Sequence, residues 1–438
     1  MDIGAVTIIL FALLLLFIVT GLPLVFALGG VGLVIMYWQL GPKFLYVVAS
    51  TAFQSWTNFI LVAIPLFIFM ANVLERSGVA EDLYAMMHRW MGPLRGGLAM
   101  GTVIICAIFA AMAGISGVAT VTMGVIALPA MLARHYDKQL AVGCVSAGGT
   151  LGILIPPSII MIIYASLTGE SVGRLFMGGV FPGILLASIF IAYIGIRSLI
   201  QPNLAPSIPK VERGTLIDKL VSSKALILPV CLILLVLGVI YTGIATPTEA
   251  SGIGAAGAVI CTIINRRFSW RNMIDASKRT LSLTAMIMWI VFGAKVFSHA
   301  YIAIGAPELV HGIIAGLEVN RWVIIVIMQF ILIILGMFID PMGIMMITTP
   351  VFLPIVQELG FNLVWFGILF TINMEIGYIT PPFGFNLFYM RGIVPKEVSM
   401  GDIYRSIWPF VILAALGIAI VMVYPQLALW LPNTMIGV

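Results

Sequence analysis

The chain has 438 residues, of which 62% are hydrophobic and only 9% are charged, whereas a soluble protein carries about 25% charged residues. A soluble fold of this length could not bury so much apolar surface, because much of any compact chain stays at its boundary. The composition therefore excludes a soluble enzyme, a nucleic-acid-binding protein and a disordered chain, and it predicts an all-α polytopic membrane protein.

Long runs without a charged residue mark the expected membrane spans in chain order. They cover residues 3–42, 44–74, 96–133, 139–169, 175–196, 225–248 and 406–438, and a spanning helix needs about 20 apolar residues. The first run contains a turn at 20–23, so it predicts two spans. The four cysteines lie inside apolar runs without metal-ligand spacing, and we interpret them as apolar filling.

A weak internal repeat divides the chain. The pair Pro-Pro occurs twice, in GILIPPS from Gly152 and in GYITPPF from Gly377, with an offset of 225 residues. Segments 265–279 and 75–96 are basic, whereas their counterparts under this offset, 40–54 and 300–321, carry few basic residues. Because Lys and Arg favour cytoplasmic loops, the two repeats are predicted to be inverted. Inverted repeats are typical of secondary transporters.

The repeat predicts a first half at 1–200, a cytoplasmic linker at 201–224 and a second half at 225–438. Each half contains an apolar run whose middle is interrupted by Gly, Ser, Asp or Pro, which predicts a re-entrant helical hairpin, at about 96–133 and about 322–357. Such irregular backbone at membrane depth must be lined by protein or water. Each half also has a helix broken at its Pro-Pro pair, at about 139–166 and about 361–390. About ten spanning helices are expected besides the hairpins.

The first broken helix predicts an ion site. Its glycines at 148, 149 and 152 weaken the helix and its paired prolines remove amide donors, so carbonyl oxygens are released for a hard cation such as sodium. The alternative is a kinked packing helix. Ser116 lies at the expected tip of the first hairpin, where it is either an ion or substrate ligand or a serine bonded to its own helix.

The second half offers polar residues at the matching places. Asp340 lies at the second expected tip and Thr380 precedes the second Pro-Pro pair, with Asn373, Glu375 and Asn386 close by. Charged residues at membrane depth are functional candidates, while the asparagines are either substrate contacts or helix–helix links. An intramembrane enzyme built on the two acids lacks a protease motif, so we do not expect an enzyme. Since there is also no phosphate-binding loop of the Walker type, uphill transport needs an ion gradient or a separate ATPase.

Several motifs in combination resemble a known family. They are PLFIFMANVLERSGVAEDL (65–83), GISGVAT (114–120), GGTLGILIPPS (148–158), MFIDPMGIMMITTPVFLPI (337–355) and IGYITPPFGFNLF (376–388). They are similar to the large membrane subunit, often called M or DctM, of tripartite ATP-independent periplasmic (TRAP) transporters. The resemblance covers essentially the whole chain.

The resemblance implies an elevator-type transporter in the bacterial or archaeal inner (cell) membrane. It implies sodium-coupled uptake of a small organic acid anion, a carboxylate or a sulfonate, delivered by a periplasmic substrate-binding protein. It also implies a small membrane subunit of about four spans, which we expect to be a separate chain. The alternative is a stand-alone sodium–dicarboxylate symporter of the related hairpin class.

The resemblance also implies site residues. The first sodium site is expected at Ser116, Gly152, Ile155 and Pro157, and the second at Asp340, Gly377, Thr380 and Pro382. The expected substrate contacts are Ser116, Ser158, Asn373 and Asn386.

Overall fold

The computed structural model describes residues 2–209, 215–315 and 319–436. Over these ranges the chain forms helices and no strand, in agreement with the all-α prediction. Residues 210–214 of the expected linker, and parts of the expected second half at 316–318 and 437–438, lie outside the described residues.

The helices follow one another with short connections. The first ten are α1 (Ile3–Val19), α2 (Leu24–Leu40), α3 (Leu45–Trp56), α4 (Ala63–Glu75), α5 (Val79–Met91), α6 (Gly97–Ala113), α7 (Ser116–Leu132), α8 (Lys138–Thr150), α9 (Ile159–Thr168) and α10 (Val172–Ile200). The others are α11 (Leu216–Ser222), α12 (Ile227–Tyr241), α13 (Pro247–Ile264), α14 (Trp270–Ala303), α15 (Ala306–Ala315), α16 (Arg321–Gly336), α17 (Pro341–Glu358), α18 (Leu363–Ile379), α19 (Phe385–Ile393), α20 (Met400–Val423) and α21 (Gln426–Asn433).

Five described segments are long and apolar enough to cross a membrane. Four are the single helices α10, α13, α14 and α20, and the fifth, Leu216–Tyr241, consists of α11 and α12 together. A sixth results if the pair 42–56 and 59–75, which bends by 51°, is one span. Shorter apolar helices include α6, α7, α9, α16 and α18, which belong to the expected hairpins and breaks together with α8, α17 and α19. The chain is therefore a multi-pass membrane protein, and the number of about ten spans stays a prediction.

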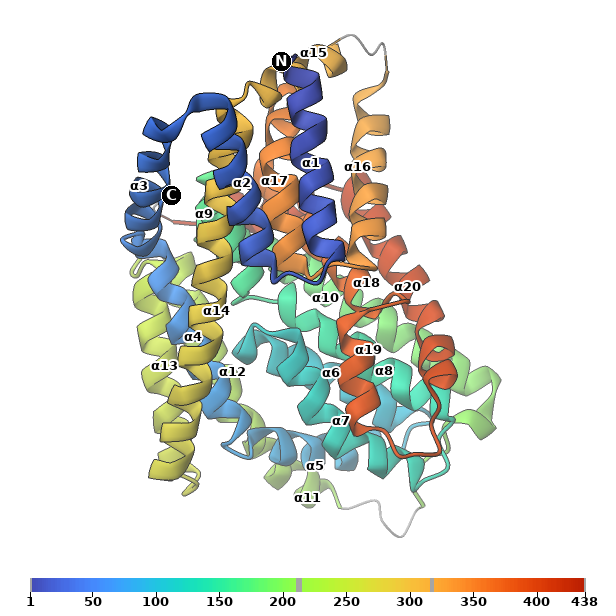
Figure 1. The fold of residues 1–438 in the computed structure, drawn as a ribbon. Coiled ribbons are helices and arrows are strands. Elements are labelled where there is room, and N and C mark those ends of the chain that lie inside the picture. Colours follow the sequence, from blue (N-terminus) through green and yellow to red (C-terminus); the bar gives the residue numbers. More distant parts are fainter. Residues whose placement is uncertain (1, 210–214, 316–318, 437–438) are drawn as a thin grey trace.

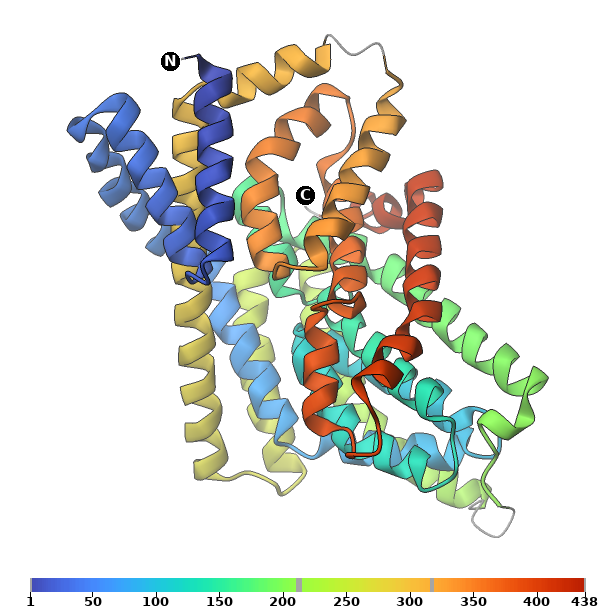
Figure 2. The ribbon, with the colours of Figure 1, turned by 45° about the vertical axis from the view of Figure 1, so that its right-hand side comes forward.

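The two expected hairpins occupy different ends of the molecule. Figures 1 and 2 show α16 and α17 in the upper half and α6 and α7 in the lower half, with the breaks between α8 and α9 and between α18 and α19 near mid-height. Helix α14 runs along one side from the top to the bottom, beside α2 and α4. The irregular segments therefore lie at middle depth, where only protein or water can satisfy their backbone groups.

Helix α14 is joined tightly to its two neighbours. A Cβ added at Gly32 of α2 would lie 2.9 Å from the carbonyl oxygen of Val296 in α14, so the small residue allows close helix packing. Farther down, Asn72 of α4 donates a hydrogen bond to the Thr280 hydroxyl of α14 at 3.2 Å. An ion pair between Arg76 and Asp275, at 3.3 Å, adds to this contact. Helices α2, α4 and α14 thus form one continuous wall.

Candidate functional site

The first break lies between α8 and α9. Helix α8 ends at Thr150, a short 3-10 turn follows over Leu151–Ile153, and α9 begins at Ile159. The Ser158 hydroxyl donates to the carbonyl oxygen of Ile153 and accepts from the Met161 amide, so it caps α9. Prolines 156 and 157 have no amide hydrogen, so backbone carbonyls next to them lack their usual helical donors.

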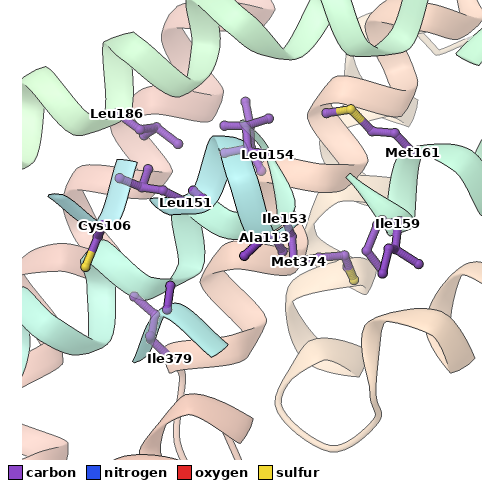
Figure 3. Packing of buried hydrophobic residues seen from close by; sticks show 14 of the residues in the cluster. Cys106, Ala113, Leu151, Ile153, Leu154, Ile159, Met161, Leu186, Met374 and Ile379 are labelled. Atoms are coloured by element: carbon purple, nitrogen blue, oxygen red, sulfur yellow. The ribbon is translucent and has the colours of Figure 1, made fainter. Parts of the chain in front are cut away.

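Apolar side chains enclose this break. Figure 3 shows Leu151, Ile153 and Leu154 of the break together with Ala113 from the end of α6 and Met374 from α18, and all five are buried. Water therefore has little access from these sides, which strengthens any electrostatic interaction with the released carbonyls. Cys106 lies in the same cluster, where its thiol is buried as apolar filling.

The tip between α6 and α7 touches the first break directly. Gly114 has a positive φ of +64°, and a Cβ added there would lie 2.4 Å from the carbonyl oxygen of Pro157. A Cβ at Gly152 would lie 3.1 Å from the carbonyl oxygen of Ile115. Of the four residues predicted for the first sodium site, Ser116, Gly152 and Pro157 are thus brought together. The side chain of Ile155 points elsewhere, against Gly183 of α10.

The second break, between α18 and α19, has a side-chain oxygen of its own. Thr380 ends α18, and its hydroxyl donates to the carbonyl oxygen of Ile376 at 2.6 Å. Since the proton is used in this bond, the lone pairs of the hydroxyl oxygen remain available to a cation. Both Pro-Pro peptide bonds, 156–157 and 381–382, are cis.

The connection between α16 and α17 contacts this second break. A Cβ added at Gly377 would lie 2.9 Å from the Cα of Gly336, at the end of α16, and the Phe383 amide donates to the Met337 carbonyl oxygen at 3.3 Å. Asp340 precedes α17, and its carboxylate accepts from the Met342 amide at 3.0 Å. The residues predicted for the second sodium site therefore come from one tip and one break in contact.

A cavity of about 370 Å³ lies between both tips, both breaks and the wall of α2, α4 and α14. Four residues give its wall polar groups, namely Ser116, Asp340, Tyr378 and Tyr389, and the others are apolar or glycine. No basic side chain is among the described residues that line it. The size suits a small organic molecule.

Basic side chains are absent from the described wall of the cavity, so positive potential in it comes from the N-termini of helices. Helices α7, α9, α17 and α19 all begin at the cavity, since Ser116, Ile159, Asp340 and Phe385 are in its wall. The first amides of a helix carry no intrahelical partner, and they favour an anion. This arrangement accommodates negative charge at low cost, and Asp340 adds a carboxylate suited to a cation beside it.

One predicted pair of substrate contacts is joined across the two halves. The Ser116 hydroxyl donates to the Asn386 side-chain oxygen at 3.0 Å, and the Asn386 amide donates to the Ser146 carbonyl oxygen at 3.1 Å. Both side chains are buried. Only Ser116 lines the cavity, so Asn386 holds the first tip rather than reaching the cavity itself.

Other predicted residues lie away from the cavity wall. The Asn373 side chain donates to the backbone and side-chain oxygens of Gln329 in α16, at 2.8 and 3.0 Å, which links two helices as the alternative interpretation foresaw. Ser158 caps α9. Their roles as substrate contacts stay predictions. Glu375 is buried, and neither carboxylate oxygen has a hydrogen-bond partner among the described residues.

The sequence reasoning missed two tyrosines of the cavity. Tyr378 follows Gly377 within the second break motif, and the ring of Tyr389 lies against Gly117 of the first tip. A hydroxyl-bearing aromatic residue directly after Gly377 in the second break motif was the available signal for Tyr378. Nothing local marked Tyr389, because its contact comes from the other half of the chain.

Comparisons with known proteins bear on this arrangement. Residues 11–427 match the family model described as "Tripartite ATP-independent periplasmic transporter, DctM component". The C4-dicarboxylate TRAP transporter large permease protein DctM of Vibrio cholerae is 32% identical, covering 98% of each chain. Its counterpart in Pseudomonas aeruginosa is 33% identical, over 88% of this chain and 89% of that protein.

Two further proteins are similar to this chain, one in sequence and one in fold. The isethionate TRAP transporter permease protein DctMQ of Oleidesulfovibrio alaskensis is 32% identical over 89% of this chain and 61% of that protein. The crystal structure of the Alcanivorax borkumensis YdaH transporter matches with a TM-score of 0.61 at 18% identity, over 90% of each chain, which shows a shared fold. With the family model matched over nearly the whole length, the predicted resemblance is confirmed, and the chain belongs to the DctM component family of tripartite ATP-independent periplasmic transporters.

Proposed function

We propose that this chain couples sodium entry to the uptake of a small organic acid anion by elevator-type alternating access. The observation that carries the proposal is the cavity in which both tips and both breaks meet. A family of secondary transporters needs one such place, because substrate and coupling ions bind near the middle of the membrane at the interface of structural repeats.

The coupling ion has a physical role in this cavity. An anion in a wall without basic side chains relies on helix N-termini, and a nearby cation strengthens its binding. The proposed sodium sites lie one at each tip: Ser116 with Gly152, Ile155 and Pro157 carbonyls, and Asp340 with Gly377, Thr380 and Pro382. Sodium is a hard cation that takes such carbonyl, hydroxyl and carboxylate oxygens.

The arrangement of helices supports a division into a moving and a fixed part. The moving part contains α6 to α9 and α16 to α19, which hold both tips and both breaks, and the fixed part includes the wall of α2, α4 and α14. The placement of α6–α7 and α16–α17 at opposite ends (Figure 2) is what two inverted repeats produce. In this proposal the moving part carries the cavity past the wall.

The substrate class is proposed as a carboxylate or a sulfonate. Two relatives are named as C4-dicarboxylate transporters and one as an isethionate transporter. The partners are a periplasmic substrate-binding protein and a small membrane subunit, in the inner (cell) membrane of a bacterium or archaeon. The matched part of the DctMQ relative is only 61% of its length, which leaves room in that protein for a further segment.

Omission of components tests this proposal against a stand-alone symporter. The chain is reconstituted into proteoliposomes with the small subunit, the binding protein and a labelled C4-dicarboxylate or isethionate, and each component is left out in turn. The proposal expects uptake only from the complete set. Equal uptake by this chain alone would favour the stand-alone sodium–dicarboxylate symporter.

A further inference from the structure

A groove on the outer surface, between α10 and α20, lies apart from the transport cavity. Its volume is about 630 Å³, and its wall consists of Ile189, Ala192, Tyr193, Ile196, Arg197, Ile200, Gln201 and Leu413. Most of these side chains are aliphatic and face outward, so the groove opens toward the hydrocarbon of the bilayer. Arg197 is the one charged residue in this wall.

The groove arises because two helices diverge. Helices α10 and α20 touch where a Cβ on Gly417 would meet Leu186 at 2.3 Å and where the rings of Phe190 and Phe410 pack edge to face, 5.4 Å apart. Beyond that point α20 packs against α8, where Gly143 of α8 lies against the backbone of Ser406 in α20. The space that opens between them is apolar, so water is a poor occupant and an acyl chain is a good one.

The end of helix α10 packs against a different helix, α6. A Cβ on Gly195 would lie 3.3 Å from Met100, and one on Gly96 would lie 2.3 Å from the Ser198 hydroxyl, so the end of α10 rests on α6. The gap between α10 and α20 is therefore fixed by two separate helix contacts.

The positively charged side chain of Arg197 lies in this gap without an acidic partner among the described residues. The Arg197 guanidinium donates to the Tyr193 hydroxyl and lies over its ring, 5.8 Å from the centroid. No described carboxylate forms an ion pair with it. Because Tyr193 accepts this bond, its hydroxyl proton remains available to donate to a ligand, and the Gln201 amide adds donors at the rim. The end of the groove thus matches a phosphate group.

The position of Arg197 along α10 indicates which membrane leaflet the groove faces. Arg197 lies three residues from the end of α10, and its neighbour Ser198 contacts Gly96, which follows Arg95. The Asp137 amide donates to the Leu204 carbonyl oxygen just beyond α10, at 2.8 Å, which brings the basic stretch 134–138 to the same end. Basic segments mark the cytoplasmic side, where anionic lipids gather.

We propose that this groove binds one anionic phospholipid of the cytoplasmic leaflet. An acyl chain fills the gap between α10 and α20, and the headgroup phosphate pairs with Arg197 and accepts from Tyr193. A lipid of net negative charge is favoured, because the phosphate of a zwitterionic lipid carries a cationic headgroup beside it that the guanidinium repels. The lipid thereby bridges the helix that leans on α6 and the helix that leans on α8.

Native mass spectrometry of the purified chain tests the site, with phosphatidylglycerol and phosphatidylcholine added in separate titrations. Phosphatidylglycerol should remain bound at higher collision energy than phosphatidylcholine. Arg197→Gln should weaken phosphatidylglycerol binding by about tenfold, as expected for loss of one charge-assisted contact. Ala192→Trp, which fills the gap from an exposed position, should displace the lipid even though Arg197 is kept.

The matched control is Arg271→Gln, an exposed arginine in the first turn of α14, which should leave phosphatidylglycerol binding unchanged. Equal retention of both lipids by the unaltered chain, or wild-type binding in both groove variants, would overturn the proposal. Displacement of phosphatidylglycerol by inorganic phosphate would also overturn it, because the site would then be a phosphate site without a role for the acyl chain.

Discussion

The two tip-and-break pairs share a backbone design and differ in their oxygen atoms. At the first pair, Ile155 stands where the second has Thr380 under the repeat offset, so a hydroxyl is missing at that place, and the Ser116 hydroxyl, which donates to Asn386, keeps its lone pairs. At the second pair, the Thr380 hydroxyl and the Asp340 carboxylate have lone pairs to offer. In the proposed sodium sites, the first therefore draws more on backbone carbonyl oxygens and the second more on side-chain oxygens. Substitutions should therefore affect the two sites in different ways.

The largest effect is expected from Gly114→Ala at the first tip. A Cβ there would lie 2.4 Å from the Pro157 carbonyl oxygen at a φ of +64°, so the tip must withdraw from the break. Sodium-driven uptake in proteoliposomes should fall at least about tenfold, the effect of a lost contact of moderate strength.

Gly169→Ala is the control for backbone strain. Gly169 has a φ of +76° but nothing within 4 Å of an added Cβ. Alanine in this conformation costs about 1–2 kcal/mol, so thermal stability should fall while uptake by the folded protein persists. Equal loss of uptake in both variants would mean that strain, and not contact with the break, explains Gly114→Ala.

The next largest effect is expected from Thr380→Ala at the second break. It removes a hydroxyl oxygen without filling space, so the sodium concentration for half-maximal uptake should rise by about tenfold. Thr380→Ser keeps the hydroxyl and should retain sodium affinity. An unchanged sodium response in Thr380→Ala would show that the second site is placed wrongly.

Asp340→Asn separates charge from capping. Asparagine still accepts from the Met342 amide, so protein level should stay the same while sodium affinity falls by less than in Thr380→Ala. Sodium titration of uptake measures this. Normal sodium affinity would reduce Asp340 to a residue that shapes the tip.

The smallest effect on transport is expected from Asn373→Leu. Asn373 bonds to Gln329 and does not line the cavity. Removing its amide leaves the Gln329 side-chain oxygen without this partner and should lower stability by about 1–3 kcal/mol, with an unchanged KM for substrate. A raised KM at unchanged stability would restore Asn373 as a substrate contact.

The positions of the breaks were predictable because their cause is local. The glycines and paired prolines around Gly152 and Gly377 disrupt a helix wherever it lies in the membrane. The resemblance of the motifs supplied the family, and most residues it implies for the two sodium sites lie at the tips and breaks, although the Ile155 side chain lies against Gly183; their roles stay predictions. The bond between Ser116 and Asn386 was not predictable, since it joins residues 270 positions apart.

The sequence also did not show which residues of α14 form the wall of the cavity. Ile287 and Ile290 of α14 line the cavity, and Ile287 is buried, whereas Trp289, between them in sequence, is half exposed and is not part of the cavity wall. In lipid, an apolar residue that faces a cavity looks the same in sequence as one that faces the bilayer. Only packing against α2 and α4 distinguishes the two faces.

Sodium-dependent uptake shows directly whether transport by this chain is coupled to sodium. Proteoliposomes that contain the chain, its small subunit and its binding protein are given labelled substrate, with either an inward sodium gradient or the same gradient of potassium. We expect concentrative uptake with sodium and none with potassium. Equal uptake under both gradients would contradict a sodium-coupled site at the two tips.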